Sequence, residues 1–279
     1  MAPATVPAMD DLHPLVAEWP VGTATLAVTD ATATLGATGD LDWVIRVASV
    51  SKILVGFAGL VALEEGTITL DEPAGPPGST VRHLLAHASG LGFEQGRPLT
   101  PPGTKRIYSN PGIDRFADHL AASAGMPFVD YLTEAVLAPL GMTSTTLVGS
   151  PAHGVHSSTG DLLRFAREVL SPTLVSAGTV ATATTAHFPD LAGVVPGVRF
   201  FDPCPWGLTM EIRGGKQPHW TGTTNAPETF GHFGGSGTFL WVDPVVGVAT
   251  VALTDRGFGP WALQVWPQAS DRVLATYGR

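Results

Sequence analysis

A serine and a lysine stand three positions apart at the start of an apolar segment, in a chain that has only three lysines. Ser49 and Lys52 belong to RVASVSKILVGFAGL, which predicts a buried helix from about Ser49 to Glu65 that ends at Gly66. Side chains at i and i+3 share one helix face, so Ser49 Oγ and Lys52 Nζ can meet. A serine needs such a base to become a nucleophile, and burial lowers the pKa of a lysine toward that role. The spacing alone would also fit a surface lysine at an ordinary helix start.

Two further segments carry polar groups that suit the same chemistry. Tyr108 and Asn110 lie in PPGTKRIYSNPG, and His232 lies in FGHFGGSGTFLWVDP. A phenol beside an ammonium group has its anionic form stabilised and can exchange protons, and an amide can orient the lysine. S-x-x-K occurs together with S-D-N and K-T-G in serine β-lactamases and penicillin-binding proteins, and these segments follow the same order.

The chain resembles the serine β-lactamase-like superfamily, which contains class C β-lactamases, D,D-carboxypeptidases and family VIII carboxylesterases. The resemblance implies that Ser49 is the acylated nucleophile, that Lys52 is its base or proton-relay partner, and that Tyr108 is the active-site tyrosine. It covers nearly the whole chain and rests on these segments in family order: ASVSK, LEEGTITLDEP, HLLAHASGL, PGTKRIYSN, SSTGDLLRFA and GHFGGSGTFLWVDP.

His232 departs from the pattern of the β-lactamases, which carry the lysine of K-T-G at this position. That lysine places a fixed positive charge near the carboxylate of the antibiotic. A histidine is largely neutral at pH 7 and can both donate and accept protons. We therefore count His232 among the catalytic residues and expect a site that is less committed to anionic substrates.

The resemblance also implies an oxyanion hole and a binding surface. The backbone N–H groups of Ser49 and Gly235 would form the hole, and such donors contribute about 3 kcal/mol each to transition-state stabilisation. Gly234 would let the strand pass close to the ligand, and Asn110 would bind a substrate carbonyl. Four aromatic residues either line an apolar acyl pocket or belong to the ordinary core: Trp206, Phe233, Trp220 and Phe230.

No metal ion or cofactor is expected. His83 and His87 are spaced i, i+4 like two ligands on a helix, but HLLAH lacks a glutamate and no third ligand is evident. The single cysteine, Cys204, excludes an internal disulfide and a cysteine-rich zinc site, and we expect it to be buried or in a loop.

The order of segments predicts an α+β sandwich of the β-lactamase/transpeptidase type. Strand patterns occur in residues 22–47 and again in WGLTMEIRG, GTFLWVD and GVATVALTD, the last two joined as a hairpin. TITLDEP is expected to be extended, and the final PWALQVWPQASDRVLATYG to be a helix interrupted near Pro267. The four helical segments between them are TVRHLLAHA, PGIDRFADHLAASAG, PFVDYLTEAVLAPLG and TGDLLRFAREVL.

These patterns predict an antiparallel sheet built from both chain ends and flanked by helices. Residues 1–75 and 201–279 would form the α/β domain that contains the sheet. Residues 76–200 would form an inserted, mainly helical domain.

Composition limits the possible partners. The chain of 279 residues has a formal net charge of −9 and no run of basic residues, so neither nucleic acid nor a membrane surface is an expected partner. The start, MAPATVPAMDDLHPLV, has no basic segment followed by an apolar one, which favours a soluble, cytoplasmic protein. The sequence leaves the oligomeric state open, and the expected partner is a small-molecule ester or amide substrate.

Three functions remain compatible with these residues. The first is a serine hydrolase that acts through an acyl-Ser49 intermediate, most of all a carboxylesterase on small esters. The same acyl-enzyme would serve a D,D-peptidase, D-amino-acid amidase, β-lactamase or acyltransferase. A non-catalytic penicillin-recognising binder is the alternative from another class, but it predicts the loss of a catalytic group.

Overall fold

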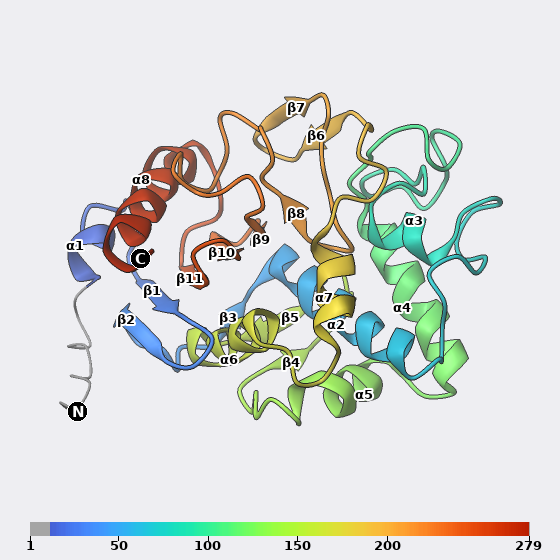
Figure 1. The fold of residues 1–279 in the computed structure, drawn as a ribbon, viewed down its shortest axis with the longest axis horizontal. Coiled ribbons are helices and arrows are strands. Elements are labelled where there is room, and N and C mark those ends of the chain that lie inside the picture. The colour runs from blue at the N-terminus through green and yellow to red at the C-terminus, as the bar shows by residue number, and fades with distance from the viewer. Residues whose placement is uncertain (1–11, 279) are drawn as a thin grey trace.

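A six-stranded antiparallel sheet forms the centre of the protein, and its strands come from both ends of the chain (Figure 1). The computed structural model describes residues 12–278. The strand order is β2-β1-β11-β10-β9-β8, so the blue N-terminal pair lies directly beside the red C-terminal strand. The strands are β1 (Ala24–Thr29), β2 (Thr34–Thr38), β8 (Glu211–Ile212), β9 (Phe230–Gly234), β10 (Thr238–Asp243) and β11 (Val248–Thr254).

Strand pairing confirms the predicted sheet from both chain ends. β1 runs antiparallel to β11, with Ala27 opposite Val251, and β10 forms the predicted hairpin with β11, with Trp241 opposite Thr250. Every residue of β10 and β11 is buried. Such fully buried strands require cover on both faces of the sheet.

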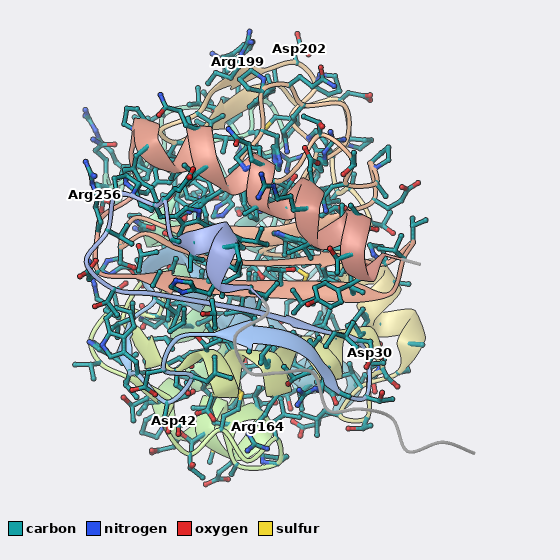
Figure 2. The ribbon with its side chains drawn as sticks, turned by 90° about the vertical axis from the view of Figure 1, so that its left-hand side faces the viewer. Asp30, Asp42, Arg164, Arg199, Asp202 and Arg256 are labelled. Atoms are coloured by element: carbon teal, nitrogen blue, oxygen red, sulfur yellow. The ribbon has the colours of Figure 1, made fainter. Side chains whose placement is uncertain are left out.

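Each face of the sheet has its own apolar core, because successive side chains of a strand point to opposite faces. Leu26 and Val28 of β1 pack with α1 (His13–Val16) and α8 (Pro260–Tyr277), and Ala27 belongs to the other core. Figure 2 shows α8 lying across the strands on the first face. The second face is covered by α2 (Ser51–Glu64) and α6 (Thr159–Leu170).

The remaining helices lie between the two groups of strands along the chain, as predicted. Two small sheets accompany them. These elements are β3 (Ile45–Arg46), α3 (Val81–Leu85), α4 (Asn110–Ala124), α5 (Phe128–Leu132), a π-helical segment (Thr133–Leu137), β4 (Thr146–Leu147), β5 (Val155–Ser157), α7 (Ala177–Thr184), β6 (Gly193–Val195) and β7 (Arg199–Phe201). One small sheet is three-stranded in the order β3-β5-β4, and the other is a two-stranded one of β6 and β7. Among residues 12–278, no helix is long and apolar enough to cross a membrane.

Helix α2 is buried on all sides, which explains why its sequence is almost uniformly apolar. Two glycines permit this packing. A Cβ atom on Gly56 would lie 2.0 Å from Thr209 Oγ1, and one on Gly59 would lie 2.6 Å from the ring of Phe116. The predicted end of the helix is also confirmed, because Gly66 has a φ of +73° just beyond it.

Three details of the sequence interpretation are wrong. TITLDEP forms no strand, and only Pro73 makes an isolated bridge, to Thr80. WGLTMEIRG contributes only the two residues of β8 to the sheet. Helix α8 continues through Pro267 without interruption, because packing of both neighbouring turns against the sheet outweighs the loss of one backbone hydrogen bond.

The division into an α/β domain and an inserted domain of residues 76–200 stays a prediction. Helix α6 falls within that range and packs on the sheet, where Thr159 Oγ1 lies 2.5 Å from Thr25 Oγ1 of β1.

Candidate active site

Ser49 lies on a tight connection between a strand and a helix. β3 ends at Arg46, the residues Ala48–Val50 form one 3₁₀ turn, and α2 follows at once. Ala48 has a φ of +48°, a strained backbone conformation for a residue with a Cβ. The turn is held by Ser51, whose Oγ donates to Ala48 O at 2.6 Å and accepts from Val155 N at 3.0 Å. Ser49 is half-buried and sits near the N-terminus of α2.

Strand β9 packs directly on this turn, and Gly234 makes that possible. A Cβ on Gly234 would lie 2.3 Å from Val47 O, so any side chain there would force β9 away from Ser49. Thr238 Oγ1 donates to the same carbonyl at 2.8 Å and fixes the turn to β10. The close approach that Gly234 permits is therefore to the backbone before the nucleophile, whereas we predicted an approach to the ligand.

The amine of Lys52 points back at Ser49 in a fully buried position. Nζ lies 3.3 Å from Ser49 Oγ, 2.7 Å from Asn110 Oδ1 and 2.8 Å from Ala152 O. Burial lowers the pKa of Lys52 to about 7, and the negative charges of Asp114 and Glu94 oppose this shift. The predicted effect of burial on Lys52 is confirmed: near pH 7 a large fraction of the amine is neutral and can accept a proton.

Asn110 contributes to the site through Lys52. Its Oδ1 accepts from the amine, and its Nδ2 donates to Glu94 Oε1 at 2.7 Å. With both ends of the amide engaged, Asn110 holds Lys52 in place, and it is not among the residues that line the cavity at Ser49.

Tyr108 and His232 form a hydrogen-bonded pair on the other side of Ser49. The Nδ1 atom of His232 lies 2.6 Å from Phe233 O, a pure acceptor, so Nδ1 carries the proton. The Nε2 atom, 3.3 Å from the hydroxyl of Tyr108, then accepts from the phenol. Burial and the charge of Lys52 lower the pKa of His232 to about 3, so the ring is neutral at physiological pH.

The phenol of Tyr108 is also neutral. Burial raises the pKa of Tyr108 far above its usual value, although contact with the Ser49 hydroxyl opposes the rise. We predicted that the nearby ammonium would stabilise the phenolate; this is wrong, because desolvation of a completely buried ring dominates. The amine lies 4.7 Å from the centre of the ring. Of the two groups, Lys52 is therefore the one able to accept a proton, and Tyr108 is able to donate one.

A cavity of about 230 Å³ opens at Ser49. The side chains that face it are aromatic or aliphatic apart from Ser49, Tyr108 and His232, and no Lys, Arg, Asp or Glu is found among its lining residues in the part of the chain that the structure describes. We name this space the Ser49 cavity. Its lining residues are Ser49, Phe93, Tyr108, Val195, Pro196, Gly197, Trp206, His232, Phe233, Gly235 and Phe258.

The predicted aromatic pocket is correct for two of its four members. Trp206 and Phe233 line the Ser49 cavity. Trp220 instead packs behind Phe233, with ring centres 5.6 Å apart, and Phe230 faces a separate cavity near α7. Position along β9 explains the outcome for Phe230, since it lies three residues from Phe233 and points to the opposite face.

Comparison with known proteins identifies the family of the chain. The pattern of the beta-lactamase family matches residues 19–274. The chain belongs to the beta-lactamase family. The family consists of hydrolytic serine enzymes, and the fold of the chain is the one its members share.

Several known proteins resemble this chain to different extents. A solved structure of a beta-lactamase from Mycobacterium bovis is 50% identical, covers 96% of this chain and 100% of its own, and superposes with a TM-score of 0.94. The D-alanyl-D-alanine-carboxypeptidase/endopeptidase AmpH of Escherichia coli is 28% identical over 47% of this chain and 50% of its own. The chain thus spans about half the length of this curated relative. Simvastatin synthase from Aspergillus terreus, 18% identical over 95% of this chain and 98% of its own, shares the fold with a TM-score of 0.79.

His87 is a part of the site in this beta-lactamase family member that we did not predict. It is completely buried, adopts a φ of +54°, and stacks on Tyr108 with ring centres 4.6 Å apart. Its Nδ1 accepts from the backbone N–H of Ser109 at 3.2 Å. We had considered His87 only as a metal-ligand partner of His83, which instead stacks on Phe188. His87 therefore supports the ring of Tyr108 by packing against it.

A buried ionic cluster lies behind Trp206. Glu211 Oε1 lies 3.0 Å from Lys216 Nζ and 3.1 Å from His219 Nε2, and Glu211 Oε2 accepts from Trp220 Nε1 at 2.7 Å. Despite burial, its charged partners hold the pKa of Glu211 well below its usual value. Lys216 lies 5.6 Å from the ring of Trp206. The cluster fixes the wall of the Ser49 cavity from outside, and the sequence held no recognisable signal for it.

Cys204 lies in the same region, in a loop, and is fully buried as expected. Burial raises the pKa of its thiol to about 11, which removes it as a nucleophile.

We expect Tyr108→Phe to lower kcat by roughly 10²–10⁴-fold, because the phenol can no longer pass a proton to the leaving group. The loss should be larger for alkyl esters than for p-nitrophenyl esters, whose leaving group needs no proton. Steady-state kinetics on ethyl butyrate and p-nitrophenyl butyrate would measure both values. The ring stacking with His87 and Trp206 is retained in the variant, but the buried Nε2 of His232 loses its hydrogen-bond donor, so thermal unfolding should occur at a somewhat lower temperature. Equal losses on the two esters would contradict the role as proton donor.

Proposed function

We propose that this chain is a serine hydrolase that acts through an acyl-Ser49 intermediate, with carboxylesterase activity on small neutral esters as its main reaction. The observation that carries the preference is the lining of the Ser49 cavity: the position at which β-lactamases have a lysine holds a neutral histidine, and no charged side chain replaces it among the described residues. A carboxylate entering this cavity would lose its hydration without gaining a partner.

The proposed reaction has two steps. Neutral Lys52 takes the proton of Ser49, whose Oγ attacks the ester carbonyl, and the backbone N–H groups of Ser49 and Gly235 stabilise the oxyanion. The C–O bond then breaks, and the leaving oxygen takes a proton from Tyr108, which regains the proton held by Lys52. Water then attacks the acyl carbonyl and gives a proton to Lys52. The bond between the acyl carbon and Ser49 Oγ breaks, the acid leaves, and Ser49 Oγ takes the proton back from Lys52.

β-Lactam hydrolysis is the second candidate, supported by the 50% identity with the structure described as a beta-lactamase. A D,D-peptidase reaction, suggested by the name of the Escherichia coli relative, would use the same residues. The preferred substrates of these two reactions carry a carboxylate.

Comparing kcat/KM across these substrate classes tests the proposal. We expect p-nitrophenyl butyrate to exceed a D-Ala-D-Ala peptide and a cephalosporin by at least about 100-fold in kcat/KM, the discrimination that an unpaired buried charge produces. A peptide or cephalosporin value equal to or above that of the ester would overturn the preference for esters and favour the second candidate.

Two changes at His232 probe the charge argument directly. His232→Lys should raise kcat/KM for the cephalosporin relative to the ester, because it adds a positive charge at the cavity. His232→Ala should change substrate preference more than the rate of acylation, since the imidazole is neutral and touches Tyr108 rather than Ser49. Burst kinetics with p-nitrophenyl butyrate would give the acylation rate. An acylation rate that falls as far as in a Lys52→Met variant would show that the imidazole takes part in the chemical step.

A further inference from the structure

A second, larger cavity adjoins the Ser49 cavity. It has a volume of about 680 Å³ and shares Phe93, Tyr108 and Pro196 with the Ser49 cavity. We name it the apolar groove. Its other lining residues are Thr104, Lys105, Arg106, Ile107, Ala192, Gly193, Val194 and Phe200.

The floor of the groove is a backbone pairing between two segments far apart in the sequence. Arg106 N donates to Ala192 O at 3.0 Å, and Arg106 bridges Gly193 in a parallel arrangement. A Cβ on Gly193 would lie 2.4 Å from Arg106 O, so only glycine allows this approach. The β6–β7 hairpin, at the top of Figure 1, is thereby fixed beside Tyr108.

The groove presents apolar side chains that no other residue in the range 12–278 covers. Val194 and Phe200 stand opposite each other in the β6–β7 hairpin and are 51% and 56% exposed, and Phe93 is 44% exposed. Adjacent exposed apolar residues that line a hollow are typical of a ligand surface.

The charged residues near the groove do not reduce its apolar character. The Arg106 side chain is buried, and its guanidinium donates to the carbonyls of Cys204, Ala86, His187 and Phe188. Arg199 projects outward from the hairpin in Figure 2 and donates to Gln217 O at 3.3 Å. Lys105 is exposed at the rim.

The position of Tyr108 decides which part of a substrate enters the groove. Its hydroxyl faces Ser49, and the same residue forms the boundary between the two cavities. In the proposed reaction Tyr108 protonates the leaving oxygen, so the alcohol part of the ester must lie on the Tyr108 side. The acyl part then occupies the smaller space between Trp206, Phe233 and Phe258.

We propose that the apolar groove binds the alcohol part of the substrate, and that the preferred substrates are esters of a short acid with a large apolar alcohol. This inference rests on the proposed acyl-Ser49 chemistry. Burying a methylene group in the groove stabilises the complex by an amount that corresponds to at most about a fourfold gain in kcat/KM per methylene.

Two matched ester series test the proposal. One series keeps the acetyl group and lengthens the alcohol from ethyl to hexyl; the other keeps the ethyl group and lengthens the acid from acetate to hexanoate. Acid release measured in a pH-stat should give a kcat/KM that rises at least about tenfold along the alcohol series. Along the acid series it should stay level or fall. A rise along the acid series alone, or along neither, would overturn the assignment.

Variants in the hairpin locate the effect. The double change Val194→Ser and Phe200→Ser should reduce the ratio of kcat/KM for hexyl acetate to that for ethyl acetate by about tenfold. Val245→Ser, which changes a valine that is 65% exposed in the turn between β10 and β11, is the control and should leave the ratio unchanged. An unaltered ratio in the double variant would show that the alcohol binds elsewhere.

These measurements are separable from those that test the hydrolase itself. Turnover of ethyl acetate and labelling of Ser49 by a fluorophosphonate report on the nucleophile, and neither involves a large alcohol that would occupy the groove. If Ser49 is labelled but kcat/KM does not depend on the length of the alcohol, only the assignment of the groove to the alcohol is refuted.

Discussion

Ser49→Ala should abolish ester hydrolysis and leave the fold intact. Loss of the nucleophile is expected to reduce kcat by roughly 10⁴- to 10⁶-fold. Lys52 keeps its hydrogen bonds to Asn110 Oδ1 and Ala152 O, so the change leaves the buried amine with hydrogen-bond partners. Thermal unfolding should therefore shift little.

Labelling distinguishes this nucleophile from other serines. Mass spectrometry after exposure to a fluorophosphonate should find one adduct on Ser49 in the unaltered protein and none in the variant. Ser51→Ala is the matched control: its hydroxyl ties the turn to Val155, so this variant should unfold at a lower temperature yet still be labelled. An unaltered protein that takes up no label would favour the non-catalytic binder.

Lys52→Met should lower kcat by roughly 10²–10⁴-fold and remove the acid limb of the pH profile. Methionine keeps the buried apolar stem but has no amine. In the unaltered protein the neutral amine is the active form, so protonation below its pKa of about 7 inactivates the enzyme. kcat/KM should therefore rise from pH 5 to pH 8 with an inflection near 7. A variant that retains full activity would refute the proposed proton path.

Glu94→Gln offers a finer test of the same amine. The negative charge of Glu94 raises the pKa of Lys52 against the effect of burial, so removing it should move the inflection to lower pH. Glutamine keeps a side-chain oxygen that can accept from Asn110 Nδ2. Asp114, His87 and His232 also interact with Lys52, as does the ring of Tyr108. Glu134→Gln, an exposed acid on the π-helical segment, is the control and should leave the profile in place.

The parts of the fold that the sequence predicts well are those with local signals. Alternation and turn residues mark β1, β2 and the β10–β11 hairpin, and the uniformly apolar run marks α2. Strand β9 carries no such signal, because FGHFG is rich in glycine and becomes a strand only through pairing with β10. Helix α8 shows the reverse, since a local breaker at Pro267 is overcome by tertiary packing.

The candidate site likewise has one part that the sequence predicts and one part that it does not. The spacing of Ser49 and Lys52 and the family order of the other segments indicate the polar groups of the centre. The groups that set the protonation of Lys52 and Tyr108 cannot be identified from the sequence. Glu94 and Asp114 act on Lys52 from separate segments of the chain, and burial raises the pKa of Tyr108, whereas we expected the ammonium to lower it. Part of the wall of each cavity comes from residues 192–200, whose position depends on the bridge to Arg106.

The pairing of β1 with β11 has a consequence for how the protein is made. Thr25 lies opposite Leu253, so the first strand emerges from the ribosome long before its neighbour has been synthesised. The turn that carries Ser49 is clamped by Gly234 and Thr238, which also come late. Contacts so distant along the chain form slowly, because a long loop must close before they contribute any stability. For most of translation the nascent chain therefore contains Ser49 but lacks β9, the strand that packs against the turn carrying it. Ser49 becomes reactive only when the C-terminal third of the chain has folded.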